Sequence, residues 1–337
     1  MDKFETWYNA NYKKLLFIPA TVLTLALLYL AFFYIQTGDI INKDVTLTGG
    51  TSITILTQES AQDLESHLSK TIQDFQIKTI SDNSGTQLEL IITAKDQDAS
   101  IMQSEIEDFI GFELTSENSS IETTSSSLSE DFYKQLIIAI TLAFFWMSAV
   151  VFLIFSKGKK AKFWTVTLNI ILGFFLGKFL LTINPILSAI IFIVISGTLI
   201  KIYIKNSIPA FAVILAAFAN IIMTLSVVNL VGIQLSTAGI VAFLMLIGYS
   251  VDTDILLTTR LLKRKEGINT SLFKAFKTGT TMTITSIIAI TTALIAIASF
   301  ESVLNQIFTI LLIGLCFDLF NTWVTNASII KWYTHQQ

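Results

Sequence analysis

Long runs of apolar residues alternate with short polar segments along most of this chain, and one longer polar stretch separates the first run from the second. A helix needs about 20 mostly apolar residues to cross a bilayer. Eight runs reach roughly that length, so the pattern predicts eight spanning helices. They cover residues 15–35, 135–155, 163–183, 186–204, 208–230, 235–258, 276–299 and 303–330.

The first apolar run has two interpretations, a cleaved signal peptide and a retained anchor. It is long, it follows Lys13 and Lys14, and no convincing small-residue cleavage site comes after it. We therefore interpret residues 1–35 as a cytoplasmic N-terminus followed by the first transmembrane helix.

Composition supports a membrane protein and argues against several kinds of site. Apolar residues make up 53% of the chain and charged residues only 14%, a balance that would leave a soluble protein prone to aggregate. The single cysteine, Cys316, allows no disulfide within the chain, and His67 and His335 are too far apart to suggest a metal site. No nucleophile motif, phosphate-binding loop or cofactor motif is present, so we expect neither an enzyme nor a cofactor.

Charge predicts the orientation. Of the 22 Lys and Arg residues, 16 lie in loops and ends on one side of the predicted spans, and the opposite short turns near 184, 232 and 301 have none. The positive-inside rule then places both termini in the cytoplasm and residues 36–134 outside. From Gln36 to Glu130 the chain has 17 acidic and 4 basic residues, which argues against nucleic-acid binding.

Residues 36–134 have the pattern of a small α+β domain. A strand over 44–57, interrupted by Gly49 and Gly50, is followed by a helix over 60–72 that Ser60 caps. Two further strands form a hairpin around the turn DNSG, and a second helix, a last strand and a polar linker at 125–129 complete the segment. The order βαββαβ predicts a ferredoxin-like domain, and hence a polytopic α-helical membrane protein with one extracytoplasmic domain.

Polar residues inside the predicted spans are the candidate functional residues, because a carboxylate in lipid is costly. Asp252 and Asp254 lie in the sixth span and Asp318 in the eighth. At 1.5 Å per residue, Asp318 lies near the middle of its span, and Asp252 and Asp254 lie roughly 8 and 11 Å to the cytoplasmic side of theirs. Asn220 is near the middle of the fifth span.

The two aspartates of the sixth span are two positions apart, so on a regular helix they point to different faces. Gly248 would make local unwinding easier, and with Ser250 it would let a neighbouring helix approach closely. The functional interpretation is a proton or ion relay. The structural interpretation leaves Asp254 solvated at the interface and Asp318 as a hydrogen-bonding contact between helices. Asn220 fits helix packing best, since it cannot titrate.

Several segments together resemble a known family. They are LTGGTSITI, SIPAFAVILAAF, GIQLSTAGIVAFLMLIGYSVDTDILLTTRLLKRKEG, KTGTTMTITS and LIGLCFDLFNTWVTNASIIKWY. These are similar to the SecF family of the protein-export machinery, within the resistance-nodulation-division superfamily, and VDTD after GYS resembles its archaeal branch. The residues that carry the motifs are Gly49, Gly50, Thr51, Gly248, Tyr249, Ser250, Asp252, Asp254 and Arg260.

The resemblance implies a subunit of the cell membrane that pairs with a SecD-like subunit beside a SecY-type translocon. It implies that the protein assists the export of polypeptides, using the proton-motive force. The basic segment RLLKRKEG fits a topology signal, with contact to membrane lipid or an acidic partner as the alternative.

The sequence departs from the family pattern at three places. The aspartate of bacterial relatives falls opposite Thr253, which leaves open whether Asp252 or Asp254 takes its role. Asn220 stands where the family commonly has an aspartate. Finally, the family has six spans, so residues 156–206 form an inserted transmembrane hairpin between the second span at 135–155 and a four-helix core at 207–337.

Two other functions compete with export. One is a proton-driven exporter of lipids or small molecules from the same superfamily, working as an oligomer because this chain has only one external domain and one set of core spans. The other is a structural scaffold in which the carboxyl groups hold helices together.

Overall fold

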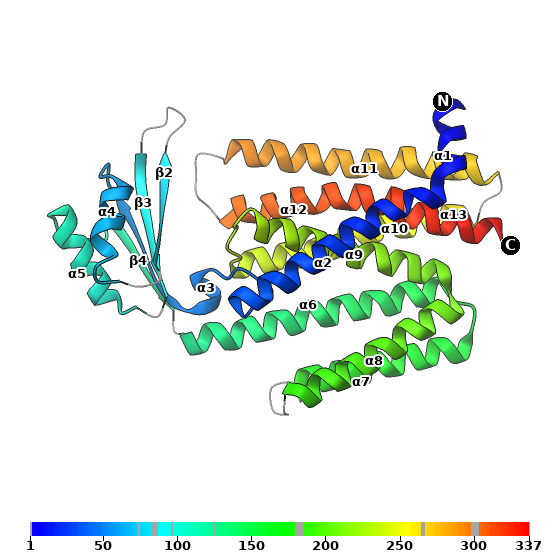
Figure 1. The fold of residues 1–337 in the computed structure, drawn as a ribbon, viewed down its shortest axis with the longest axis horizontal. Helices are drawn as coiled ribbons and strands as arrows, with labels where there is room; N and C mark the ends of the chain where they lie inside the picture. Colours follow the sequence, from blue (N-terminus) through cyan, green and yellow to red (C-terminus); the bar gives the residue numbers. More distant parts are fainter. Residues whose placement is uncertain are drawn as a thin grey trace.

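A helical bundle and a small α+β domain lie end to end in the molecule (Figure 1). The computed structural model describes residues 2–72, 75–81, 87–95, 97–124, 126–178, 185–263, 267–297 and 303–336. Both chain ends lie at the end of the bundle opposite the domain (Figure 1).

The bundle consists of long helices that run nearly the whole distance between its two ends (Figure 1). Its elements are α1 (Asp2–Leu15), α2 (Phe17–Thr37), α6 (Ser126–Phe155), α7 (Lys159–Lys178), α8 (Pro185–Asn206), α9 (Ile208–Leu230), α10 (Thr237–Leu262), α11 (Ile268–Ala296), α12 (Val303–Phe320), η1 (Asn321–Asn326) and α13 (Ala327–His335). The element η1 is a turn of π-helix that joins α12 to α13.

Seven helices within the described ranges are long and apolar enough to cross a membrane, and they correspond to seven of the eight predicted spans. The predicted span 163–183 is the exception. Its helix α7 ends at Lys178, and residues 179–183 lie outside the described residues. Lysines at both ends of α7 lower its mean hydropathy, so α7 is less apolar than the seven other helices.

The domain contains α3 (Val45–Thr48), β1 (Gly50–Leu56), α4 (Ala61–Leu68), β2 (Phe75–Ser81), β3 (Gln87–Ala94), α5 (Ala99–Ile110) and β4 (Ser119–Thr124). All strand pairs are antiparallel in the order β2-β3-β1-β4, with Ile53 opposite both Ile92 and Ile121. Helices α4 and α5 cover the face of the sheet away from the bundle (Figure 1). This is the ferredoxin-like arrangement that the element order predicts.

The structure of the domain confirms one local prediction from the sequence and contradicts two others. The Ser60 hydroxyl caps α4 by accepting the Asp63 amide at 3.4 Å. The strand predicted from residue 44 is wrong in its first half, because Val45–Thr48 forms a helical turn and the strand begins at Gly50. The linker predicted at 125–129 is also wrong, because α6 begins at Ser126. The turn DNSG lies outside the described residues.

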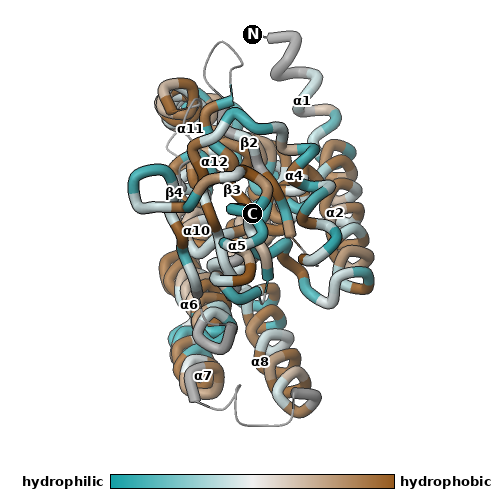
Figure 2. The backbone as a smooth tube through the Cα atoms, turned by 90° about the vertical axis from the view of Figure 1, so that its left-hand side faces the viewer, coloured by the Kyte–Doolittle hydropathy of each residue, from teal (hydrophilic) through white to brown (hydrophobic). Residues whose placement is uncertain are grey.

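The helices α7 and α8 form a hairpin that packs against one side of the bundle (Figure 2). Phe152 of α6, Leu172 of α7 and Leu199 of α8 are fully buried in one apolar cluster, which Val213 of α9 also joins. The residues of the predicted insertion therefore pack against α6 and α9 and share one apolar cluster with them.

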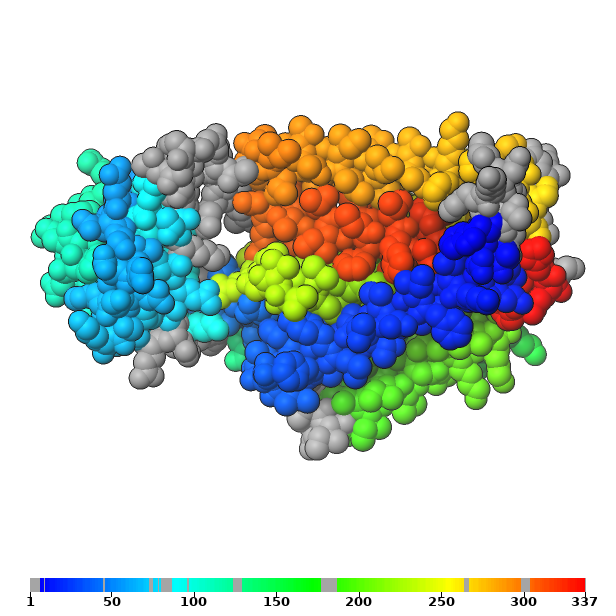
Figure 3. Space-filling model, turned by 45° about the horizontal axis from the view of Figure 1, so that its top comes forward, coloured from blue at the N-terminus to red at the C-terminus, as the bar shows by residue number. Residues whose placement is uncertain are grey.

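The N-terminal segment runs across the outside of the bundle and meets the C-terminus (Figure 3). The hydroxyls of Tyr8 and Ser328 are 3.3 Å apart. The ammonium group of the buried Lys331 lies over the rings of Tyr8 and Tyr12, at 4.8 and 5.2 Å from their centroids. These contacts fasten α1 to α13.

Candidate functional site

Helix α10 places its two aspartates on different faces. Ser236 caps its start by accepting the Gly239 amide, and the helix continues without interruption through Gly248 to Leu262. Residues two positions apart on a helix point in nearly opposite directions. Asp252 is accordingly exposed, and Asp254 is completely buried. The helix is not unwound at Gly248, so the two carboxylates do not face one common site.

Asp254 lies against the π-helical turn η1. Asn326 donates a hydrogen bond from Nδ2 to Asp254 Oδ1 at 2.8 Å, and the same nitrogen lies 3.4 Å from the hydroxyl of Thr258. The second carboxylate oxygen of Asp254 has no hydrogen-bond partner among the described residues. Asp254 is therefore a core residue rather than a solvated group at the membrane interface.

Asp318 approaches the same place from α12. Its side chain is 1% exposed, Thr322 donates to its Oδ1 at 3.5 Å, and its Oδ2 has no hydrogen-bond partner among the described residues, although the Ser250 hydroxyl lies nearby. The carboxyl groups of Asp318 and Asp254 are close enough to interact electrostatically. Neither forms a salt bridge with a described Lys or Arg. Two acidic groups from α10 and α12 thus meet inside the bundle.

The helices that carry this pair and their neighbours bury other polar side chains. Thr325 donates to Asn321 Oδ1 at 3.3 Å, and Asn321 Nδ2 contacts the sulfur of Met223 at 3.5 Å. The amide group of Asn220 on α9 is fully buried and has no hydrogen-bond partner within the described ranges. Further buried polar side chains on α9, α10, η1 and α13 are Thr224, Thr253, Thr258, Thr322 and Ser328.

The π-helical turn is the feature that sequence reasoning missed. It buries Asn321, Thr322, Thr325 and Asn326 together, and such turns occur frequently at functional sites. The available signal was the string NTWVTN inside an apolar run. Four of its six residues, two Asn and two Thr, have side chains that form hydrogen bonds, which is unusual within an apolar run.

The remaining motif residues of α10 face other directions. Gly248 is exposed, and an alanine-sized side chain at this position would meet nothing within 4 Å in the described structure, whereas Ser250 is buried on the side of α10 that faces Asp318 of α12. Val241, Met245 and Tyr249 are each more than 40% exposed. With Asp252 they form an exposed stripe along α10. Arg260 instead ties α10 to α11, donating to the Lys274 carbonyl and the Thr278 hydroxyl at 2.9 Å each.

The motif Gly49-Gly50-Thr51 serves the domain. Gly49 and Gly50 have positive φ angles of 79° and 134°, and a side chain on Gly50 would collide with the carbonyl oxygen of Ala94. Thr51 is buried and donates to the Gln97 carbonyl at 2.8 Å. These residues shape the entry into the sheet and lie away from the carboxyl pair.

The segment 40–48, which we name the strap, connects α2 to the domain and is bonded to the bundle. Asn229 of α9 donates to the Ile40 carbonyl at 2.9 Å and accepts the Asn42 amide at 3.3 Å. Asn42 and Asp44 exchange backbone hydrogen bonds with Leu235, just before α10.

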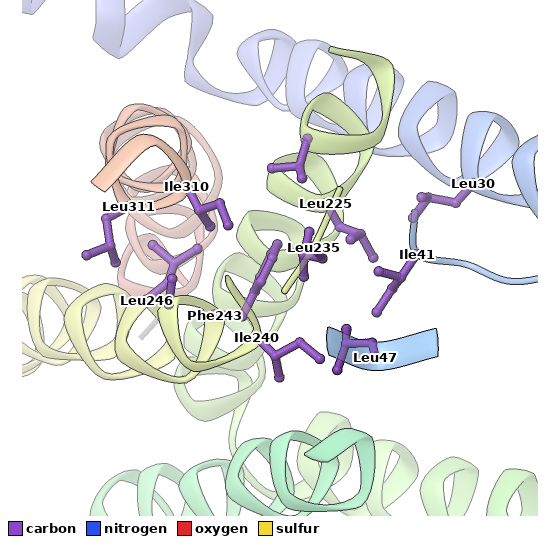
Figure 4. Packing of buried hydrophobic residues seen from close by; sticks show 12 residues of the cluster. Leu30, Ile41, Leu47, Leu225, Leu235, Ile240, Phe243, Leu246, Ile310 and Leu311 are labelled. Carbon is purple, nitrogen blue, oxygen red and sulfur yellow. The ribbon is translucent and has the colours of Figure 1, made fainter. Parts of the chain in front are cut away.

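Apolar contacts and the ammonium group of Lys43 also hold the strap against the bundle. Its Ile41 and Leu47 point into the apolar cluster of Leu235, Ile240 and Phe243 (Figure 4). Tyr133 of α6 donates to Asp39 at 2.8 Å, and Lys43 pairs with the same Asp39 and lies over the Tyr133 ring. The strap therefore joins the domain to α6, α9 and α10.

Fold and site together define a multi-pass membrane protein with one α+β domain at an end of its bundle and a carboxyl pair in its core. A family model described as "Protein export membrane protein SecD/SecF, C-terminal" matches residues 172–336. The protein-export membrane protein SecF of Methanocaldococcus jannaschii is 32% identical over 96% of each chain, and that of Methanothermobacter thermautotrophicus is 32% identical over 96% of this chain and 93% of its own. The chain belongs to the SecF family.

A solved structure shows the same fold. The crystal structure of SecDF from Thermus thermophilus, described as a translocon-associated membrane protein, superposes with a TM-score of 0.61 and 14% identity. The alignment covers 97% of this chain and 38% of the SecDF chain. The chain therefore spans well under half of that protein. The relatives are named as membrane proteins of protein export rather than as enzymes.

Proposed function

We propose that the chain pairs with a SecD-like subunit and assists polypeptide export beside a SecY-type translocon of the cell membrane. Membership of the SecF family supports this. So does the coverage of only 38% of the SecDF chain, which leaves the larger part of that chain for a partner to supply. In this proposal the termini are cytoplasmic, as the distribution of lysine and arginine indicates.

The exposed stripe of α10 is the proposed contact surface for the SecD-like partner. It places the Asp252 carboxylate on the outer surface of a membrane-spanning helix. A carboxylate facing lipid is costly, and intramembrane charges normally face a bundle interior or a cavity. Gly248 lies open in the same stripe and leaves room for a helix to approach closely.

The observation that carries the coupling proposal is the meeting of Asp254 and Asp318 in the core. Two ionised carboxylates without a cation partner are unfavourable in a buried site, whereas a protonated carboxyl group can donate a hydrogen bond to its neighbour. Loading and release of a proton would therefore change how α10 and α12 pack. The proton-motive force can act on the protein through this change.

The strap provides the mechanical connection in this proposal. It is hydrogen-bonded to Asn229 at the end of α9 and to Leu235 just before α10. A displacement of α10 along or across the bundle would move the strap and, with it, the sheet that begins at Gly50. The domain can thus act on a polypeptide that emerges outside.

The test is export in cells whose own SecF has been replaced. We expect Asp254→Asn with Asp318→Asn to abolish the acceleration of export by the proton gradient while the subunit still co-purifies with its SecD-like partner. Asp108→Asn with Glu113→Gln changes the same number of charges at exposed positions of the domain and serves as the control. Asp252→Asn should instead weaken co-purification.

Three results would count against the proposal. Normal gradient-dependent export in the double aspartate variant would exclude proton coupling at this pair. Loss of assembly in that variant would favour a purely structural role for the carboxyl groups. A wild-type subunit that purifies alone, or only with copies of itself, would favour the exporter of lipids or small molecules.

A further inference from the structure

A cluster of lysines lies where the α7–α8 hairpin begins and ends. A side chain on Gly158 would lie 3.9 Å from Asn206 Oδ1, so the start of α7 adjoins the last residue of α8. Five exposed lysines lie at this end of the hairpin, and we name them the hairpin lysine cluster: Lys157, Lys159, Lys160, Lys201 and Lys205. They come from both helices and from the turn that precedes α7.

The stretch of chain that carries the cluster contains no acidic residue. The sequence contains no Asp or Glu from residue 132 to residue 251, which covers α7, α8, α9 and nearly all of α6. No member forms a salt bridge with a described residue. Lys162 differs from the cluster because its ammonium group has a partner within the protein. It donates to the Leu153 carbonyl at 2.7 Å and so caps the end of α6.

Aromatic and apolar residues place the cluster at the level of lipid headgroups. Phe163 and Trp164 directly follow it, are 67% and 56% exposed, and pack edge to face. Aromatic residues of this kind collect at membrane interfaces. Further along the hairpin, Phe174, Ile193 and Val194 are all more than 60% exposed. The hairpin thus exposes apolar side chains that suit acyl chains.

We propose that the hairpin lysine cluster binds the phosphate of anionic lipid headgroups. Several ammonium groups within one Debye length attract an anionic membrane surface cumulatively, and lysine stems reach along an apolar surface to do so. The apolar flank of the hairpin would hold the acyl chains of the same lipid. This proposal does not depend on proton coupling or on the SecD-like partner, because it concerns a surface on the far side of α6.

The test uses the full-length protein in nanodiscs that contain phosphatidylglycerol in phosphatidylcholine. Bound phosphatidylglycerol is counted by native mass spectrometry for the wild type and for the variant Lys157→Gln, Lys159→Gln, Lys160→Gln. The control is Lys14→Gln, Lys263→Gln, Lys277→Gln, which removes three exposed lysines at the same end of the bundle. We expect the hairpin variant to bind phosphatidylglycerol at least about tenfold more weakly and the control to bind as the wild type does.

Further measurements distinguish binding of a lipid from binding of other anions. Inorganic phosphate at millimolar concentration should displace little phosphatidylglycerol, since it lacks the acyl chains; full displacement would assign the cluster to free phosphate and overturn the lipid proposal. Arginine at the same three positions should retain lipid binding. Equal losses in the hairpin variant and the control would mean diffuse charge attraction and no site. Unchanged lipid binding with loss of a co-purifying protein would assign the surface to an acidic protein partner instead.

Discussion

Asn326 and Asp254, 72 positions apart in the chain, are joined by a hydrogen bond of 2.8 Å between two completely buried side chains. The π-helical turn at Asn321–Asn326 brings the amide group of Asn326 to face α10. Because the other oxygen of Asp254 has no hydrogen-bond partner in the described structure, this bond is the main polar contact of that carboxyl group. Asn326 therefore holds the titratable carboxyl group of Asp254 in place, while its own amide group does not titrate.

Replacing Asn326 by leucine should destabilise the protein. The change removes the donor and leaves a buried carboxyl group without its partner, which costs about 2–3 kcal/mol. Thermal unfolding of the purified protein in detergent would measure it. Asn11→Leu, which breaks an exposed bond to the Trp7 carbonyl, serves as the control and should change the stability by less than about 0.5 kcal/mol. Equal stabilities of the two variants would show that the bond does not support the core.

A second prediction concerns the contact between α10 and α12. A side chain on Gly314 would meet the two methyl groups of Leu246 at 2.5 Å each. We expect Gly314→Val to push the helices apart and to destabilise the bundle by about 1–3 kcal/mol, the usual cost of overpacking. Denaturant titration of the bundle would measure the loss. Shortening the facing side chain in the double variant Gly314→Val, Leu246→Ala should recover part of the stability, and an additive effect of the two changes would contradict direct contact.

The third prediction concerns Gly50, whose φ of 134° and closeness to the Ala94 carbonyl leave no room for a side chain. Gly50→Ala should disrupt the start of β1 and unfold the domain locally, at a cost of about 3 kcal/mol or more, since both backbone strain and a clash with the main chain are involved. Protease accessibility of residues 50–94 would report it. Gly111→Ala is the matched control, with positive φ and open space around it, and should remain protease-resistant.

Much of the architecture was predictable because it follows from simple patterns. Apolar runs of spanning length identified the bundle, and the order of elements identified the ferredoxin-like sheet. The exceptions are local. Val45–Thr48 contains β-branched residues and was predicted as a strand, yet it forms a helical turn because Asp44 and Leu47 are held against the end of the bundle. Tertiary contacts outweigh strand propensity there.

The candidate site was predictable in its residues but only partly in its geometry. Helix periodicity correctly separated the faces of Asp252 and Asp254. Periodicity could not indicate which of the two faces is buried, because the residues on both sides of the aspartates are apolar. The estimated depth in the membrane placed Asp254 nearer to the cytoplasmic surface than Asp252, although Asp254 is the buried one. The π-helical turn shifts the register of the last span by a fraction of a turn. No single-sequence pattern locates such a shift, so the contact of Asn326 with Asp254 was not foreseen.

The last prediction concerns the strap, which joins the domain to the helices of the carboxyl pair. Asn229→Ala removes two hydrogen bonds, one to the Ile40 carbonyl and one from the Asn42 amide, each contributing about 1 kcal/mol. Amide exchange of residues 40–48, measured by mass spectrometry, should then accelerate roughly thirtyfold, since exchange follows the free energy of local opening. Ile41 and Leu47 stay packed against the bundle, so the domain itself should keep its protection.

The control for the strap is Thr24→Ala, which removes a hydroxyl that bonds only within its own helix, at the Ala20 carbonyl. It should leave exchange of the strap unchanged. If Asn229→Ala also leaves that exchange unchanged, the side-chain bonds of Asn229 are dispensable, and the backbone pairing with Leu235 and the packing of Ile41 and Leu47 suffice to hold the strap. If exchange accelerates while gradient-dependent export persists, the strap is not the path by which α10 moves the domain.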